Sequence, residues 1–159
     1  MIVRFGQILL AWLAGSATAY ALASVAHTQT ILAALGDLGV RIAPGERLAT
    51  SIGDLAGLWR YGLVIAIGLA LGLFALRAPP RRLVPLPPAA RDALAGALAV
   101  ACTLLAMRLA FSITPIASAR GVGGFALQCA SGGAGGLVFF ACLKRTEAAR
   151  TDAARTDAA

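Results

Sequence analysis

The chain has 159 residues, of which 59% are hydrophobic and only 13% are charged, and its formal net charge is +7. A soluble domain of this length cannot hide so much apolar surface, so the composition excludes an ordinary water-soluble fold. The positive charge does not indicate a nucleic-acid partner, because the basic residues stand at the ends of long apolar stretches, where they set membrane topology.

Four apolar stretches are each close to the ~20 residues that a helix needs to cross a bilayer. They predict membrane spans over residues 5–25, 52–76, 92–113 and 121–143. The chain is therefore predicted to be an all-α integral membrane protein, a bundle of four transmembrane helices. Residues 1–145 form one membrane domain, and residues 146–159 form a disordered polar tail.

The first stretch has features of a signal peptide and of a retained helix. A small-x-small sequence before Ser24 resembles a cleavage site. Against removal, the apolar run is long, and Ala11, Gly15, Ala19 and Ala23 recur every four residues. This spacing puts them on one helical face, where small side chains let another helix approach closely. We therefore expect a retained first helix that packs through Gly15 and Ala19.

The first outer loop, between the first two spans, carries a predicted short interfacial helix. Apolar side chains recur with helical spacing over residues 28–38, which is typical of a helix lying on a membrane surface. Pro44-Gly45 then predicts a turn. Ser51 and Asp54 match a capping box, which predicts the start of the second span.

The later connections contain proline, and the tail is polar. Five prolines over residues 79–88 predict a stiff, extended connection between the second and third spans. Thr114-Pro115 predicts the end of the third span. After residue 145 an Arg-Thr-x-Ala-Ala sequence repeats without any large apolar side chain, so we expect a mobile, solvated tail.

The distribution of basic residues predicts the orientation of the chain. The predicted outer side of the membrane has four basic residues: Arg41, Arg47, Arg60 and Arg120. The side with both termini and the Pro-rich connection has nine: Arg4, Arg77, Arg81, Arg82, Arg91, Lys144, Arg145, Arg150 and Arg155. Because basic loops stay in the cytoplasm, we predict a multi-pass protein of the bacterial inner membrane with cytoplasmic N and C termini.

Arg108 is the charged residue furthest inside a predicted span. An ionisable group at membrane depth is a functional-site hypothesis, because burying its charge in lipid is unfavourable. The leading interpretation pairs Arg108 with Asp54 at the outer end of the second span, and His27 would complete a polar cluster there. Alternatively, Arg108 extends its side chain to the headgroups, or it contacts a ligand.

The sequence Gly132-Gly133-Ala134-Gly135-Gly136 supports two interpretations. Glycines spaced by four favour close helix packing, through Gly132 and Gly136 here and through Gly68 and Gly72 in the second span. Alternatively, the glycines break the helix, and freed backbone groups bind an ion or solute, as in some transporters. In that case the ligand contacts would be Gln128, Ser131, Gly132 and Gly133.

Catalytic, metal and cofactor sites are not indicated. The three cysteines, Cys102, Cys129 and Cys142, are widely spaced within spans and form no redox or zinc motif. His27 is the single histidine, which is too few for a metal site without nearby cysteines or carboxylates. Neither a nucleophile–base set nor a phosphate-binding Gly-Lys sequence occurs. We predict no catalytic residues, no metal and no cofactor.

The function predicted first is that of a non-catalytic accessory or assembly subunit, which packs in the lipid bilayer against a larger membrane complex or against copies of itself. A second hypothesis is a small-solute or ion transporter or channel that uses Arg108, Gln128 and a helix break at Gly132–Gly136. A third is a membrane enzyme with an outer-rim site of His27, Asp54 and Arg108.

Overall fold

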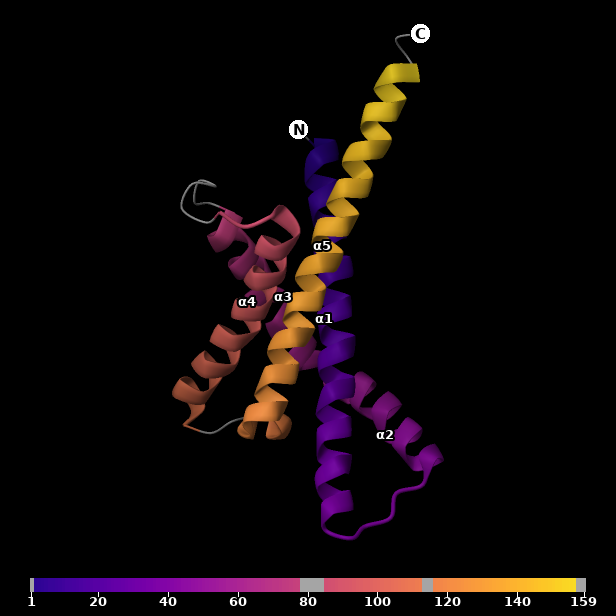
Figure 1. Ribbon diagram of the computed structural model, residues 1–159, viewed down its shortest axis with the longest axis vertical. Helices are drawn as coiled ribbons and strands as arrows, with labels where there is room; N and C mark the ends of the chain where they lie inside the picture. Colours follow the sequence, from indigo (N-terminus) through magenta and orange to yellow (C-terminus); the bar gives the residue numbers. More distant parts are fainter. Residues whose placement is uncertain (1, 78–84, 113–115, 157–159) are drawn as a thin grey trace.

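The computed structural model describes residues 2–77, 85–112 and 116–156, which contain helices and connections but no strand. Figure 1 shows their arrangement. The elements in chain order are α1 (Ile2–Asp37), α2 (Pro44–Gly57), α3 (Trp59–Arg77), α4 (Pro88–Phe111), the 3-10 helix η1 (Ala117–Arg120) and α5 (Val122–Thr156).

Four of these helices, α1, α3, α4 and α5, are long and apolar enough to cross a membrane. Their qualifying segments are Phe5–Asp37, Trp59–Arg77, Pro88–Ala110 and Val122–Thr151. Each contains most of one predicted span. The prediction of an all-helical bundle with four helices of membrane-spanning length is therefore confirmed.

The long helices α1 and α5 run side by side in opposite directions, and α3 and α4 pack along them (Figure 1). We call the end that carries α2, η1 and the start of α5 the α2 end. The opposite end, where α3 ends and α4 begins, is the tail end. Both chain termini lie on the tail-end side in Figure 1.

The first helix is longer than the predicted span. Residues 28–38 do not form a separate helix, because α1 continues without interruption to Asp37. Nothing between the predicted span and Gly39 breaks a helix. Gly39 then ends it, with a positive φ of 86°. The Val40 amide donates to the Leu35 carbonyl at 3.1 Å, which completes a Schellman C-cap.

The separate short helix between the first two helices of spanning length is α2, at residues 44–57 instead of 28–38. Pro44 does not form a turn but begins α2. This position suits proline, which has no backbone N–H, because the first residue of a helix needs no N–H to donate within the helix. The Ala43 amide donates to Glu46 Oε2 at 3.0 Å, so Glu46 caps the helix. Ser51–Asp54 lies inside α2, and the next helix of spanning length begins at Trp59.

Glycine permits the closest helix contacts in the bundle. An added Cβ on Gly15 of α1 would lie 2.6 Å from the Gly135 carbonyl oxygen of α5, and an added Cβ on Gly135 would lie 2.6 Å from the Gly15 carbonyl. Gly132 of α5 faces Gly96 of α4 in the same way. Such backbone contacts are available only to glycine, so small residues fix the position of α5 between α1 and α4.

The remaining packing glycines lie against α4. An added Cβ on Gly72 of α3 would come within 2.6 Å of the Ala99 Cβ, and one on Gly68 would collide with Thr103. Gly136 of α5 lies against the Asp92 carbonyl. Since α5 is uninterrupted from Val122 to Thr156, the glycine-rich sequence serves helix contact and does not break the helix.

Residues 146–156, predicted as a disordered tail, are the last turns of α5. Alanine has the highest helix propensity, so the Ala-rich repeat extends the preceding helix although it buries little. The Thr151 hydroxyl also donates to the Glu147 carbonyl at 3.0 Å within these turns. The end of the predicted tail, residues 157–159, lies outside the described residues.

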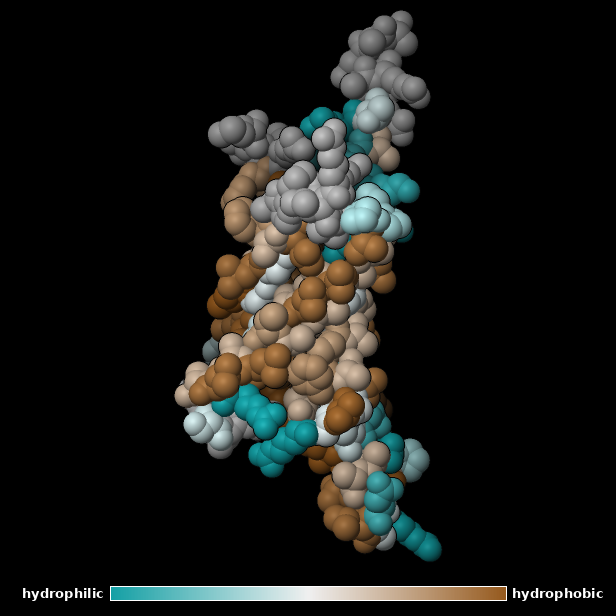
Figure 2. Space-filling model, turned by 60° about the vertical axis from the view of Figure 1, so that its left-hand side comes forward, coloured by the Kyte–Doolittle hydropathy of each residue, from teal (hydrophilic) through white to brown (hydrophobic). Residues whose placement is uncertain are grey.

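The surface is apolar where the helices are long. Figure 2 shows a broad hydrophobic band across the middle of the molecule, with hydrophilic residues concentrated toward its two ends. Large apolar side chains point outward from this band, among them Leu71 and Phe74 of α3, which are 65% and 76% exposed. This surface is compatible with a multi-pass membrane protein, because lipid would cover it.

Candidate functional site

A chain of buried hydrogen bonds joins the helices at the α2 end. Gln128 of α5 is fully buried. Its Oε1 accepts a hydrogen bond from the Tyr61 hydroxyl at 2.9 Å, and its Nε2 donates to the Ala23 carbonyl at 3.0 Å. Nε2 also donates to Ser118 Oγ at 3.3 Å, and Ser118 Oγ lies 3.0 Å from His27 Nδ1. We call Tyr61, Gln128, Ser118 and His27 the polar chain.

The local structure explains how these residues meet. Tyr61 is in the first turn of α3, Gln128 is in the second turn of α5, and Ser118 lies on η1 between α4 and α5. Gly124 of α5 faces the Ser118 carbonyl so closely that an added Cβ would collide with it. That contact brings η1 against the helices and places the Ser118 hydroxyl between His27 and Gln128.

The polar chain is satisfied within the protein. Both ends of the Gln128 side-chain amide have partners, so burial leaves neither the oxygen nor the nitrogen without a hydrogen bond. The Ser118–His27 contact has the spacing of a nucleophile and a base. However, the Ser118 hydroxyl is buried and shared with Gln128, and Asp54 bonds to a different residue instead of orienting His27. The arrangement favours cross-linking of helices over catalysis.

A second polar cluster fastens α2 to α1. Thr28 Oγ1 donates to Asp54 Oδ2 at 2.7 Å, and Gln29 Nε2 donates to Ser51 Oγ at 3.2 Å. Arg47 Nη1 donates to Gln29 Oε1 at 3.0 Å. The Tyr20 hydroxyl of α1 also donates to a backbone carbonyl of α2. We call the contacts of Arg47, Ser51 and Asp54 with α1 the α2 clamp.

The predicted cluster of His27, Asp54 and Arg108 is only partly brought together. His27 belongs to the polar chain, and Asp54 belongs to the α2 clamp through the neighbouring Thr28. Arg108 is exposed on α4 and, in the described part of the chain, has no ion pair with Asp54. α2 packs on α1 and α3, which explains why Asp54 meets α1 first.

Each predicted ligand contact is used in hydrogen bonding or packing within the bundle. Gln128 is occupied by the polar chain, and the Ser131 hydroxyl donates to the Leu127 carbonyl of its own helix at 2.8 Å. Gly132 and Gly133 lie against α4, where an added Cβ on Gly133 would be 3.4 Å from the Ala93 carbonyl. Among the described residues no group of three His, Cys, Asp or Glu side chains is placed to hold a metal ion.

An ion pair that sequence analysis missed lies at the tail end. Arg77 Nε and Nη2 donate to the two carboxylate oxygens of Asp92 at 3.0 and 2.5 Å. The guanidinium carbon of Arg77 is 4.6 Å from the centre of the Phe139 ring. Beside this pair, Arg91 Nε donates to the Leu76 carbonyl at 2.6 Å. These contacts join α3, α4 and α5. The one sequence signal was an acidic residue at the start of an apolar span.

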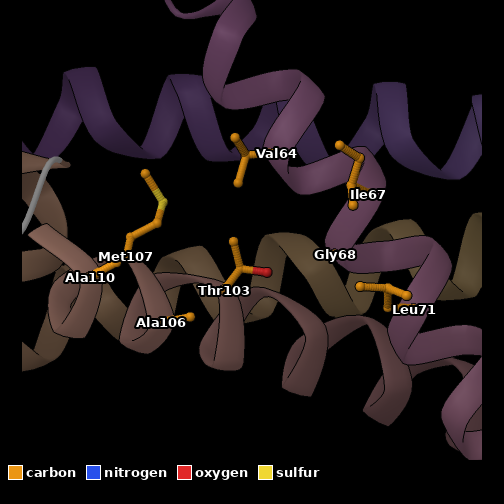
Figure 3. Close-up of a pocket in the computed structure, with 8 residues that line it drawn as sticks. All are labelled: Val64, Ile67, Gly68, Leu71, Thr103, Ala106, Met107 and Ala110. Carbon is orange, nitrogen blue, oxygen red and sulfur yellow. The ribbon is translucent and has the colours of Figure 1, made fainter.

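An apolar groove opens outward between α3 and α4, with a volume of about 340 Å³. Figure 3 shows its lining, in which Gly68 and Leu71 come from α3 and Thr103, Ala106 and Ala110 come from α4. We call this hollow the α3–α4 groove. Small residues on both helices give it depth, and sequence analysis singled out only Gly68 among them.

Comparison with protein-family models, with curated proteins and with solved structures finds no match for this chain.

Proposed function

We propose that this protein is a non-catalytic subunit of a larger membrane assembly, and that its α3–α4 groove receives a transmembrane helix of a partner protein. The observation that carries the proposal is the groove itself, an outward-facing apolar hollow of about 340 Å³. In a membrane, small residues at such a surface allow the backbone of another helix to approach closely.

The Thr103 hydroxyl favours a helix over a lipid chain as the occupant of the groove. This side chain lies between α3 and α4 in Figure 3 and, among the described residues, has no hydrogen-bond partner. An acyl chain offers nothing to a hydroxyl group, whereas a neighbouring helix can supply a backbone carbonyl or a polar side chain. Association with a helix would therefore satisfy the groove's polar atom as well as fill its apolar space.

The interior of the bundle supports a packing role over transport or catalysis. The polar chain is hydrogen-bonded within the protein, and the glycines of α5 are closed against α1 and α4. A carrier using Gln128 would have to break these contacts, and α5 has no helix break at Gly132–Gly136. An enzyme at the α2 end would need His27, Asp54 and Arg108 together.

We further propose that the chain is a multi-pass protein of the bacterial inner membrane, with both termini in the cytoplasm. The nine-to-four distribution of basic residues in the sequence supports this orientation. In this orientation the tail end faces the cytoplasm, and α2 lies at the periplasmic surface of the inner membrane.

Photo-crosslinking in cells tests the partner proposal. A benzophenone amino acid replaces Ile67, which lines the groove and is 61% exposed, or Leu105, which is 50% exposed on another face of α4. We expect a discrete adduct with another membrane protein from position 67 and none from position 105. An Ala106→Leu change, which fills the groove without entering the bundle interior, should abolish the adduct.

Equal labelling at both positions, or adducts with lipid alone, would contradict the proposal. An adduct with a second copy of this chain would show a homo-oligomer instead of a different partner.

A further inference from the structure

The amphipathic helix α2 packs with its polar face inward. The α2 clamp residues Arg47, Ser51 and Asp54 are spaced by four and three, so they lie on one face, and that face contacts α1. None of the residues of α2 is buried. A helix on the surface of a soluble protein would do the opposite and bury its apolar face.

The apolar side chains of α2 consequently point away from the bundle. Leu48, Ile52 and Leu55 form one stripe and are 63%, 61% and 40% exposed. We call these three residues the α2 stripe. In Figure 1, α2 leaves the bundle obliquely beside the lower part of α1.

Exposed apolar residues of α3 follow directly after the α2 stripe in the chain. Only Leu58 separates the two helices, and Trp59 and Leu63 lie in the first two turns of α3. Trp59 and Leu63 are each 55% exposed, and they lead to the hydrophobic band of α3. The guanidinium carbon of Arg60 lies 5.6 Å from the centre of the Trp59 ring, and tryptophan is enriched at the membrane–water interface.

We propose that the α2 stripe is embedded in a lipid surface, among the acyl chains just below the headgroups. This inference rests on the membrane placement proposed above, and it does not depend on the α3–α4 groove. The closeness to α3 in the chain decides the occupant. If exposed Leu63 meets lipid, exposed Leu55 lies only eight residues before it, on the helix that ends next to the start of α3. The α2 clamp then holds the helix at the interface while its stripe faces lipid.

Spin labels on α2 in lipid nanodiscs test the inference. Single cysteines replace Ile52 on the stripe or Thr50 on the opposite face, in a background without the three native cysteines. We expect the label at position 52 to collide with oxygen, which dissolves in lipid, severalfold more than with a water-soluble nickel complex. The label at position 50 should show the reverse preference.

Two outcomes overturn the inference. Equal nickel access at positions 52 and 50 would place the stripe in water, and shielding of position 52 from both reagents would place it against protein. A label at Phe74 of α3, which is 76% exposed and does not line the α3–α4 groove, separates this failure from failure of the membrane placement. Lipid exposure at position 74 with water exposure at position 52 rejects only the role of α2. Leu55 provides a second stripe position if the variant at Ile52 does not fold.

Discussion

Gln128 shows how one buried amide fixes the relative positions of several helices. Its oxygen and nitrogen reach Tyr61 on α3, Ala23 on α1 and Ser118 on η1, so a shift of any of these elements breaks a hydrogen bond. Hydrogen bonds between helices in a membrane contribute about 0.6–2 kcal/mol each. Their larger effect is on specificity, because the apolar surfaces around Gln128 would tolerate other alignments.

Removing Gln128 should therefore destabilise the bundle more than removing one of its partners. Tyr61→Phe leaves the Gln128 oxygen unpaired and should lower the free energy of unfolding by about 1–2 kcal/mol. Gln128→Leu removes three hydrogen bonds at once and leaves the buried Tyr61 hydroxyl without its partner, so it should lower the free energy by about 2–4 kcal/mol. The double variant should be less destabilised than the sum of the two. Equilibrium unfolding in mixed detergent measures all three variants.

Thr18→Val is the matched control for loss of a hydroxyl. The Thr18 hydroxyl donates to the Ala14 carbonyl within its own helix at 2.9 Å and joins no second element. Its removal should change stability by less than Tyr61→Phe does. Equal effects of the two changes, or full stability of Gln128→Leu, would mean that the polar chain does not hold the helices in place.

Individual polar residues were recognisable in the sequence, but most of their partners were not. Gln128 stood out as an amide within an apolar span, yet it lies 67 residues from Tyr61 and 105 from Ala23, and no spacing rule relates them. The Arg77–Asp92 pair was missed for a related reason. A count of basic residues per side contains no information about which carboxylate each guanidinium meets.

At the scale of the helices, α4 and α5 meet closely because glycine has no side chain at their contact. An added Cβ on Gly132 would lie 2.5 Å from Val100 Cγ2 and would also collide with the Gly96 carbonyl. Gly133, the next residue, would meet atoms only at 3.4 Å and beyond. Substitution of Gly132 therefore tests steric packing, whereas the same substitution at Gly133 tests helix propensity alone.

Gly132→Ala should force α4 and α5 apart and lower the free energy of unfolding by about 1–3 kcal/mol, as overpacking does in tightly packed interiors. Gly133→Ala should be neutral, or stabilising by up to about 1 kcal/mol, because alanine is the better helix former. The thermal midpoints of the two variants in detergent give the comparison. Similar midpoints for both would argue that α4 and α5 do not meet through these glycines.

The existence of the four long helices could be predicted from the sequence, whereas the limits of α1 and α2 could not. Residues 28–37 have a helical pattern that fits either a separate surface helix or a longer first helix, and only the packing of α2 on that segment distinguishes the two. Pro44 is equally suited to a turn and to the first position of a helix. Local rules therefore left the first outer loop ambiguous, and tertiary contacts decided it.

The whole molecule mixes polar and apolar side chains in its interior and exposes many large apolar ones. Ser24 and Gln128 are fully buried, as are Ile65 and Leu69, while other large apolar side chains, such as Leu71, point outward. Water would penalise that arrangement, since exposed leucine and phenylalanine contribute nothing to a water-soluble core. Lipid would remove the penalty and leave close contact and hydrogen bonding as the forces between helices. Orientation in that lipid is then a matter of charge at the two ends.

Orientation gives the prediction for the whole molecule: the tail end faces the cytoplasm. Nine basic residues against four favour this side. The pairing of Arg77 with Asp92 does not weaken the argument, because the rule counts basic residues and not net charge.

Fusions after Arg77 and after Arg150 should be fluorescent with a reporter that is active only in the cytoplasm. A fusion after Pro44 should give phosphatase activity, which requires export. Each position carries both reporters in turn, so that a silent fusion is distinguished from a misplaced one. Phosphatase activity after Arg150, or a mature N-terminus at Ser24, would contradict the predicted topology.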